Sequence, residues 1–198
     1  MEAKFYKRAL AYLIDVIVVV LLFMVIAYFI PQSKNIYSLQ TELDWINESL
    51  MLNEMDLGIY FHRIGIVYYD MYKVLMVFNI LSLVIGIFYF GILQWKLNGQ
   101  TLGKKLFKIQ VISNDDYGVT LPQLFVRGLI INGFFFAIYS LLMSFLLAKY
   151  VYFVTVVLVG MIQVALFLVS VFMVFYSRKK RGLHDIIGRT KVIEKEGN

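Results

Sequence analysis

The stretch that decides the fold covers residues 129–176 and reads LIINGFFFAIYSLLMSFLLAKYVYFVTVVLVGMIQVALFLVSVFMVFY. Lys149 is the only charged residue among these 48 positions. An unbroken helix of this length would extend about 72 Å at about 1.5 Å per residue, whereas the hydrocarbon core of a bilayer is about 30 Å thick. The segment must therefore fold back, and we expect a very short turn near Lys149 between two membrane-spanning helices.

Composition extends this conclusion to the whole chain. Of its 198 residues, 61% are hydrophobic and only 16% are charged, against roughly a quarter charged in a soluble domain. Such a chain has too few polar side chains to cover a core in water, so the sequence predicts an all-α membrane protein of one domain, residues 1–198. A spanning helix needs about 20 apolar residues, and four segments qualify: 9–30, 74–95, 129–148 and 150–176. The first is too long for the apolar part of a signal peptide and no cleavage pattern follows it, so we expect it to be retained.

The positive charges indicate which side of the membrane each loop occupies. Fifteen of the nineteen Lys and Arg residues lie before the first span, in the inner loop 96–128 or in the tail 177–198; the others are Lys34, Arg63, Lys73 and Lys149. The outer loop 31–73 instead holds six acids, Glu42, Asp44, Glu48, Glu54, Asp56 and Asp70. Because basic loops stay in the cytoplasm, we expect a four-helix transmembrane bundle with both termini inside. The net charge of +6 then reflects topology rather than nucleic-acid binding.

Both long loops carry signals of local structure. In the outer loop, acids alternate with apolar residues over 39–55, which predicts a short amphipathic helix at the membrane interface; an ordered surface loop without a ligand is the alternative. The aromatic residues that follow predict an interfacial belt leading into the second span: Tyr60, Phe61, Tyr68, Tyr69 and Tyr72.

The inner loop predicts a small cytoplasmic β element. Residues 98–101 favour a turn that ends in a helix cap at Thr101, and 102–108 a short basic helix. β-like runs follow at 108–112 and 190–194, with a turn at 114–118 and a return strand at 119–121. Pro122 suits the first turn of the helix that enters the third span.

Several kinds of site are excluded by the residues that the sequence lacks. There is no cysteine and there are only two histidines, His62 and His184, which removes disulfides, thiol nucleophiles and the usual zinc and iron–sulfur sites. The segment 99–104 has three residues between its glycines and no Ser or Thr after its lysine, so it departs from a phosphate-binding loop. The spans hold no catalytic acid pair or nucleophile–base dyad, and we expect a protein without enzymatic activity, cofactor or metal.

Asp15 is the only acidic residue within a predicted span. A carboxylate there costs about 2.5–3.5 kcal/mol on insertion scales, so it must point into the bundle and find a partner. Arg8 lies seven positions earlier and shares its helix face; Arg127 and a basic residue of the tail are the other candidates. The sequence leaves open whether this is an ion or proton site or a structural ion pair that fixes the helix register.

Polar and small residues also recur at helical spacing in or next to the other spans. They are Asn79, Ser82, Gly86 and Gln94 in the second; Gly128, Asn132, Ser140 and Ser144 in the third; and Gly160, Gln163, Ser170 and Ser177 in the fourth. Such residues favour close helix packing, and the alternative is that they face one another and Asp15. Beyond the fourth span we expect Asp185 to pair with a nearby Arg or Lys at the membrane surface, because its neighbour His184 faces elsewhere on a helix.

Three motifs combine into a known pattern. Arg8 and Asp15 belong to the first span, the inner loop has Gly-x-Thr-x-Gly-Lys, and a His-Asp pair follows the basic stretch of the tail. The residues that match in the loop and tail are Gly99, Thr101, Gly103, Lys104, His184, Asp185, Gly188 and Thr190. On these residues the sequence resembles the RDD family, small multi-span membrane proteins named for that Arg, that Asp and a second Asp, here Asp185. It departs from the family in its long acidic outer loop and its fourth span.

The resemblance implies two kinds of function. One is transport, of a cation in exchange for protons or of a small solute, with Asp15 as the intramembrane polar site and Arg8, Arg127 and Asp185 as further polar residues. The other is a non-catalytic accessory or assembly subunit of a membrane complex. The expected partners are the lipid bilayer, anionic lipid at the cytoplasmic face, and a second copy of the chain or another membrane protein. The expected location is the plasma membrane of a bacterium.

Overall fold

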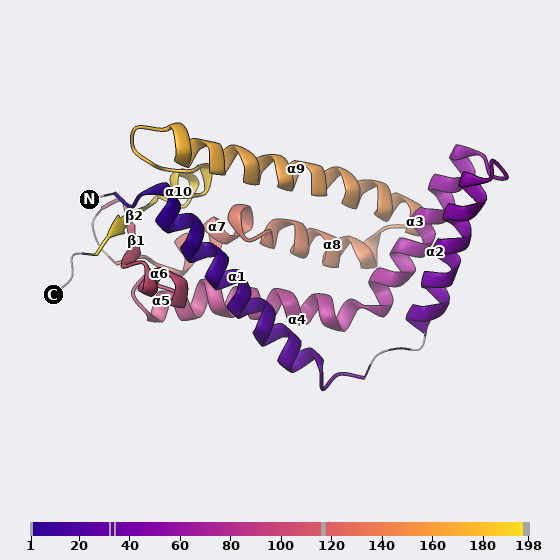
Figure 1. Ribbon diagram of the computed structural model, residues 1–198, viewed down its shortest axis with the longest axis horizontal. Helices are drawn as coiled ribbons and strands as arrows, with labels where there is room; N and C mark the ends of the chain where they lie inside the picture. Colours follow the sequence, from indigo (N-terminus) through magenta and orange to yellow (C-terminus); the bar gives the residue numbers. More distant parts are fainter. Residues whose placement is uncertain (1, 32, 34, 116–117, 196–198) are drawn as a thin grey trace.

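Three helices of the computed structural model, which describes residues 2–31, 33, 35–115 and 118–195, are long and apolar enough to cross a membrane. They are α1 (Phe5–Ala27), the rod Met76–Lys96 and α9 (Lys149–Tyr176). The rod consists of α4 (Met76–Ile87), the π-helical turn η1 (Phe88–Leu93) and α5 (Gln94–Lys96). The rod and α9 follow the long axis of the molecule, and α1 crosses obliquely (Figure 1). The predicted all-α membrane fold is confirmed.

The third span departs from its predicted course. Instead of one helix over 129–148, the chain forms α7 (Leu121–Ile131) and α8 (Phe134–Leu146), bent by 80°. Gly133 lies at the bend with φ of 71°, a left-handed conformation that residues with a Cβ adopt at a cost. The predicted continuous helix is therefore wrong, and this bent pair is a fourth span only when its two helices are taken together.

The bend frees backbone carbonyl groups, and side chains of neighbouring helices bind them. The amide Nε2 of Gln163 on α9 donates to the carbonyl oxygen of Ile130 at 2.7 Å, and the hydroxyl of Tyr12 on α1 donates to that of Ile131 at 3.0 Å. Because an unsatisfied carbonyl is expensive in an apolar environment, these two side chains stabilise the bend.

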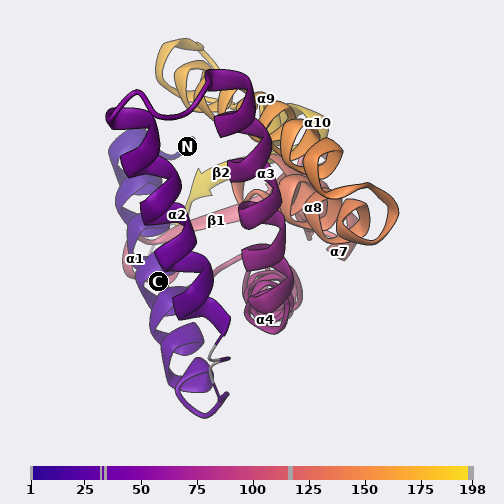
Figure 2. The ribbon, with the colours of Figure 1, turned by 90° about the vertical axis from the view of Figure 1, so that its right-hand side faces the viewer.

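The outer loop is a helical hairpin rather than one helix and a loop. Its helices, α2 (Asn35–Met51) and α3 (Leu57–Val74), pack around Ile46, Ile64 and Val67, and Figure 2 shows them side by side across the end of the bundle. The predicted amphipathic helix over 39–55 is confirmed for the part that falls within α2. The prediction misses α3 because its aromatic residues were interpreted as an interfacial belt. Lys34, counted with the outer basic residues, lies outside the described residues.

Those aromatic residues attach the hairpin to α9. Tyr68 stacks on Phe153 with ring centroids 5.8 Å apart, and Tyr69 and Tyr72 both contact the ring of Tyr152, at 5.2 and 5.4 Å. The predicted short turn is confirmed, since α8 ends at Leu146 and α9 begins at Lys149. The ammonium group of Lys149 lies 2.7 Å from the carboxylate of Asp70 on α3.

The opposite end of the molecule carries a small layer of short elements (Figure 1). They are α6 (Leu102–Leu106), β1 (Ile109–Ser113), α10 (Leu183–Ile187) and β2 (Thr190–Glu194). The strands pair antiparallel with Val111 opposite Val192, which confirms the predicted β element. Thr101 caps α6 as predicted, its hydroxyl accepting from the N–H of Lys104 at 3.4 Å.

The return strand predicted at 119–121 is wrong. Thr120 instead precedes α7, where its N–H donates to the side-chain oxygen of Gln123 at 3.0 Å, and Pro122 lies in the first turn of that helix as predicted. The turn predicted at 114–118 includes residues 116 and 117, which lie outside the described residues, as do 196–198 of the predicted tail.

The residues before α1 complete this end layer. Glu2 forms a β-bridge with Ile193, and the N–H of Ala3 donates to the carbonyl oxygen of Val192 at 3.0 Å. Ala3 and Val192 are buried in the same apolar cluster as Val111. Both ends of the described chain thus lie at one end of the bundle, as expected for termini on the same side of a membrane.

Substituting Gly133 tests the bend. The Cβ of an alanine would meet no neighbouring atom within 4 Å there, so the positive φ alone determines the cost, about 1–2 kcal/mol for an L residue. We expect Gly133→Ala to lower the melting temperature in detergent. Gly91→Ala is the matched control, because its Cβ would make only ordinary van der Waals contacts, at 3.8 Å and beyond, and its φ is not positive. Equal melting temperatures for the two variants would contradict the strained bend.

Candidate functional site

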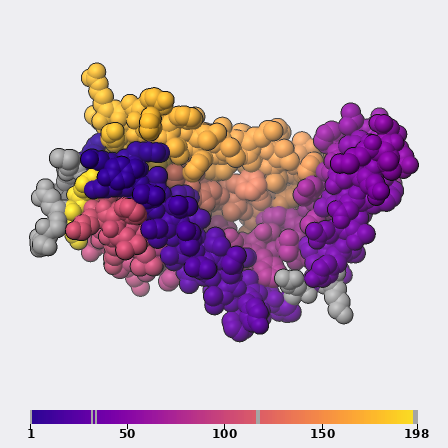
Figure 3. Space-filling view, viewed as in Figure 1, coloured from indigo at the N-terminus to yellow at the C-terminus, as the bar shows by residue number. Residues whose placement is uncertain are grey.

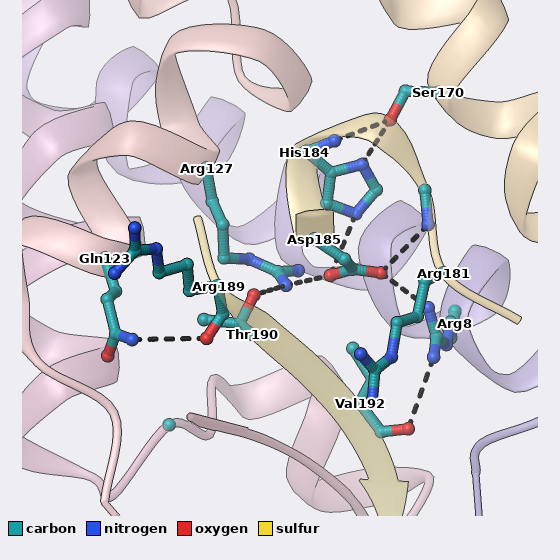
Figure 4. A network of polar contacts seen from close by, with 12 residues as sticks. Arg8, Gln123, Arg127, Ser170, Arg181, His184, Asp185, Arg189, Thr190 and Val192 are labelled. Atoms are coloured by element: carbon teal, nitrogen blue, oxygen red, sulfur yellow. Dashed lines mark hydrogen bonds and ion pairs between the residues drawn. The ribbon is translucent and has the colours of Figure 1, made fainter. Parts of the chain in front are cut away.

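Asp185 lies at the centre of a buried polar network near the end layer (Figure 4). The carboxylate is 0% exposed. Arg8 Nη1 lies 3.0 Å from its Oδ2, Arg127 Nη1 contacts its Oδ1, and the N–H of Gly182 donates to Oδ2 at 3.2 Å. Two guanidinium groups from α1 and α7 therefore converge on one carboxylate of α10.

Further hydrogen bonds join this network to α9 and β2. Arg127 Nη1 also donates to the hydroxyl of Thr190 at 2.8 Å, and Arg8 Nη2 donates to the carbonyl oxygen of Val192 at 3.2 Å. Ser170 on α9 accepts from the N–H of His184 at 3.2 Å and lies 2.5 Å from its Nδ1. Helices α1, α7, α9 and α10 and strand β2 thus meet at this one point.

The charges of the network follow from burial and from the two arginines. Burial alone would raise the pKa of Asp185, but Arg127, His184 and Arg8 outweigh it and lower that pKa to about 2. Burial lowers the pKa of His184 to about 3, against the attraction of Asp185. At neutral pH the carboxylate is charged and the imidazole is neutral, with Nε2 at 3.4 Å from Asp185 Oδ1.

Asp15 forms a second network with the inner loop. This carboxylate is also 0% exposed. It accepts from the hydroxyl of Tyr89 at 2.7 Å, the hydroxyl of Thr101 at 2.5 Å and the N–H of Gly103 at 2.8 Å, and Lys104 Nζ lies 3.8 Å away. The motif Gly-x-Thr-x-Gly-Lys therefore surrounds a carboxylate of the protein itself.

Two glycines allow these close approaches. A Cβ at Gly103 would overlap the carbonyl oxygen of Ala11, so α6 reaches α1 only without a side chain there. Gly99 has φ of 80°, and a Cβ there would overlap the carbonyl oxygen of Val111. In the other network, a Cβ at Gly188 would lie 2.8 Å from Cγ of Arg127.

The structure thus pairs the predicted residues differently from the sequence interpretation. Arg8 and Arg127, both considered as partners of Asp15, bind Asp185, and the charged partner of Asp15 is Lys104. The expected pairing of Asp185 with an Arg is confirmed, but the pair is buried rather than at the surface. His184 also approaches Asp185, although adjacent positions were expected to face apart.

Several other predicted positions join the same two networks, and one residue of the Asp15 network was missed. Thr101, Gly103, His184 and Thr190 all make the contacts described above. The polar residues Ser140 and Ser144 bind carbonyl oxygens of their own helix, and of the second-span set Gln94 reaches the Asp15 network through Lys104, at 3.4 Å. Sequence reasoning missed Tyr89, because an aromatic residue in an apolar span gives no signal of a polar role.

The family model for the RDD family matches residues 2–189, nearly the whole chain. The chain belongs to the RDD family. RDD proteins are membrane proteins, in agreement with the apolar helices described above. No curated protein and no solved structure matches the chain. In this RDD protein Arg8 and Asp185 bind each other, whereas Asp15 binds the inner loop.

Two cavities lie beside the bend of the RDD bundle. The inner cavity, of about 600 Å³, lies between α1, α7 and α9 next to the end layer, and the outer cavity, of about 300 Å³, lies between α1, α4 and α8. Their walls share Tyr12, Val16, Phe90 and Asn132. Among the described residues that line the two cavities, neither Asp15 nor Asp185 occurs. Their basic partners line the inner cavity: Arg8, Lys104 and Arg127.

Lys104 connects the Asp15 network to the inner cavity. Burial lowers its pKa to about 8, although Asp15 opposes this shift. Among the described residues no group of three or more His, Asp and Glu side chains is arranged to hold a metal ion. The polar chemistry of this RDD protein therefore centres on buried ion pairs next to an apolar cavity.

A double-mutant cycle tests the pairing. We expect Arg8→Gln and Asp185→Asn to be coupled by about 0.5–3 kcal/mol in the free energy of unfolding, as for residues in direct contact. The control cycle combines Arg8→Gln with Asp15→Asn, whose effects should add within about 0.5 kcal/mol. Unfolding in detergent micelles measures both cycles, and stronger coupling to Asp15 would contradict the structure.

The pH dependence of stability tests the buried imidazole. Unfolded His184 takes up a proton below about pH 6.5, whereas the pKa in the folded protein is lowered to about 3. Protons therefore favour the unfolded chain between these values, and stability falls as the pH is lowered from 6.5, by at most about 1.4 kcal/mol per pH unit. We expect His184→Asn to reduce this slope between pH 6.5 and 4.5, and His62→Asn, at an exposed position, to retain it. Identical slopes for both variants would contradict a neutral buried His184.

Proposed function

We propose that this RDD protein is transport-related and moves a small solute through the two cavities beside the bent third span. The observation that carries the proposal is that the cavities share four wall residues, Tyr12, Val16, Phe90 and Asn132, although they lie toward opposite ends of the bundle. A movement of these shared wall residues would join the two cavities into one path between the two sides of the membrane.

The bend itself supports the proposal. Binding sites of transporters commonly lie at interrupted helices, where backbone groups are held by side chains. Here Gln163 and Tyr12 hold the freed carbonyl groups of Ile130 and Ile131. Breaking and re-forming these side-chain hydrogen bonds costs less free energy than breaking the backbone hydrogen bonds of a continuous helix. Helices α7 and α8 are therefore suited to change their relative angle.

The charges favour a neutral or anionic solute over a cation. Among the described residues that line the inner cavity, none is Asp or Glu, whereas Arg8, Lys104 and Arg127 are basic. Asp15 then acts indirectly, by holding Lys104 at the wall. On this proposal Asp15 is a positioning residue rather than the group that binds the transported species.

Labelling of introduced cysteines tests the path, since the chain has no cysteine of its own. A membrane-impermeant maleimide reacts with thiolate, which forms in water but not in lipid. We expect Val171→Cys of the inner cavity to react from the cytoplasmic side, Ser140→Cys of the outer cavity from the outside, and Val16→Cys of the shared wall from both.

Val25→Cys is the control, because Val25 is exposed on the bundle and outside both cavities. Its thiol should react from neither side. The proposed path is refuted when the three cavity positions are as unreactive as Val25→Cys from both sides of sealed vesicles.

A second candidate function is that of a non-catalytic accessory subunit, and the outer hairpin favours it. Trp45, Met51 and Leu57 of this hairpin are at least half exposed and extend the apolar surface beyond the bundle. Another membrane protein or a second copy of the chain is the proposed partner. Stable co-purification from native membranes, lost on Trp45→Ser, would support this function; a clean monomer would count against it.

We further propose that the protein has no enzymatic activity, lies in the plasma membrane of a bacterium, and attracts anionic lipid through the basic end layer.

A further inference from the structure

We infer that the inner cavity binds one anionic phospholipid of the cytoplasmic leaflet, with its phosphodiester headgroup at the basic end of the cavity and an acyl chain along the apolar end. This inference rests on the proposed function in one respect, since it names the class of solute that the cavities handle.

The charged side chains Arg8 and Arg127 line the cavity at the end next to the sheet, among apolar residues such as Ile109 and Val192. Farther along the bundle the wall is mostly apolar, with Val16, Ile131 and Phe167 beside Tyr12 and Asn132. From Arg8 to Val16 the rise along α1 is about 12 Å. A phospholipid of the inner leaflet has the same order, with the headgroup at the cytoplasmic surface and its chains toward the middle of the membrane.

The cavity is open sideways toward the lipid. Leu10 and Leu13 of α1 line it and remain about half exposed. Helices α1 and α9 lie close together at the end layer, where the rings of Phe5 and Phe175 are 5.4 Å apart, and they diverge toward the outer hairpin. Figure 3 shows the surface of α8 between them. A lipid chain can therefore enter from the bilayer without crossing water.

The charge of the wall selects an anion. The carboxylates of Asp15 and Asp185 lie behind the three basic side chains, which face the cavity between them and the lipid. With His184 neutral, three positive charges oppose two negative ones, and one positive charge remains. A guanidinium group binds phosphate oxygens well, and a lipid with one negative charge balances the charge that remains.

The volume of the inner cavity lies in the range of known ligand cavities. Ligand cavities in proteins commonly measure about 300–1,000 Å³ and are mostly apolar with a few polar groups that orient the ligand. The inner cavity, at about 600 Å³, fits that description.

Native mass spectrometry of the full chain tests the site. The protein is extracted in mild detergent from vesicles with equal amounts of phosphatidylglycerol and phosphatidylcholine of identical acyl chains, and the retained lipid is identified. We expect wild type to retain phosphatidylglycerol in preference. Lys104→Gln should reduce that preference about fivefold, the effect of one basic residue on an anionic lipid, and Lys104→Arg should restore it.

Two matched controls separate the site from general effects. Lys105→Gln removes the same charge from an adjacent exposed position outside the cavity and should leave the preference unchanged. Val171→Trp fills the cavity without touching a charge and should abolish lipid retention, whereas Val169→Trp, on the same helix but outside the cavity wall, should not. Circular dichroism and gel filtration verify that each variant is folded.

The outcomes distinguish this inference from the proposed transport. Equal retention of the two lipids by wild type, or equal effects of Lys104→Gln and Lys105→Gln, overturns the lipid site while leaving the cysteine-labelled path standing. Displacement of bound phosphatidylglycerol by the soluble headgroup glycerophosphoglycerol alone also overturns the lipid site, because the acyl chain would then contribute nothing to binding. Selective retention without movement of tail-labelled phosphatidylglycerol between leaflets of proteoliposomes supports the site and removes the transport proposal.

Discussion

Two buried carboxylates bring most segments of this protein together, because a charge in an apolar interior must be paired. Asp185 requires the guanidinium groups of Arg8 and Arg127, and so joins α1, α7 and α10. Asp15 requires the hydroxyl of Tyr89 and the N–H and hydroxyl groups of the inner loop. Since α1 contributes Arg8 to one network and Asp15 to the other, its register relates both networks to each other. Loss of either carboxylate would leave several donors unpaired at once.

The irregular parts of the helices lie where these networks meet the cavities. The π-helical turn η1 carries Tyr89, which binds Asp15, and next to it Phe90, which lines both cavities. The bend of the third span places Asn132 on the same shared wall. Irregular backbone inside a membrane is tolerated only where protein or a cavity covers it. The irregular segments of the helices therefore lie next to the cavities.

Sequence reasoning succeeds where the signal is a one-dimensional pattern. The apolar run around Lys149 determines a hairpin because its length exceeds the membrane thickness, and the β-like runs at 108–112 and 190–194 do pair. The same reasoning assigns the wrong partner to Asp15, because periodicity gives the face of a helix but not what lies opposite. Arg8 and Asp15 share a face about 10 Å apart along the axis, too far for direct contact. The bend at Gly133 could not be predicted because the residues around it are apolar, as in a continuous span. Helix α3 was missed because its aromatic residues also suit an interfacial belt.

The arrangement of charges also relates the inner cavity to the end layer. Arg8 and Arg127 face Asp185 on one side and the cavity on the other. An anion that enters the cavity therefore competes with Asp185 for the N–H donors of these guanidinium groups and is repelled by its carboxylate. A shift of Arg8 changes its hydrogen bond to the carbonyl oxygen of Val192, and a shift of Arg127 changes its hydrogen bond to the hydroxyl of Thr190. Because β2 carries both of these acceptors, the guanidinium groups link the cavity wall to the two-stranded sheet, which lies at the opposite end of the molecule from the outer hairpin.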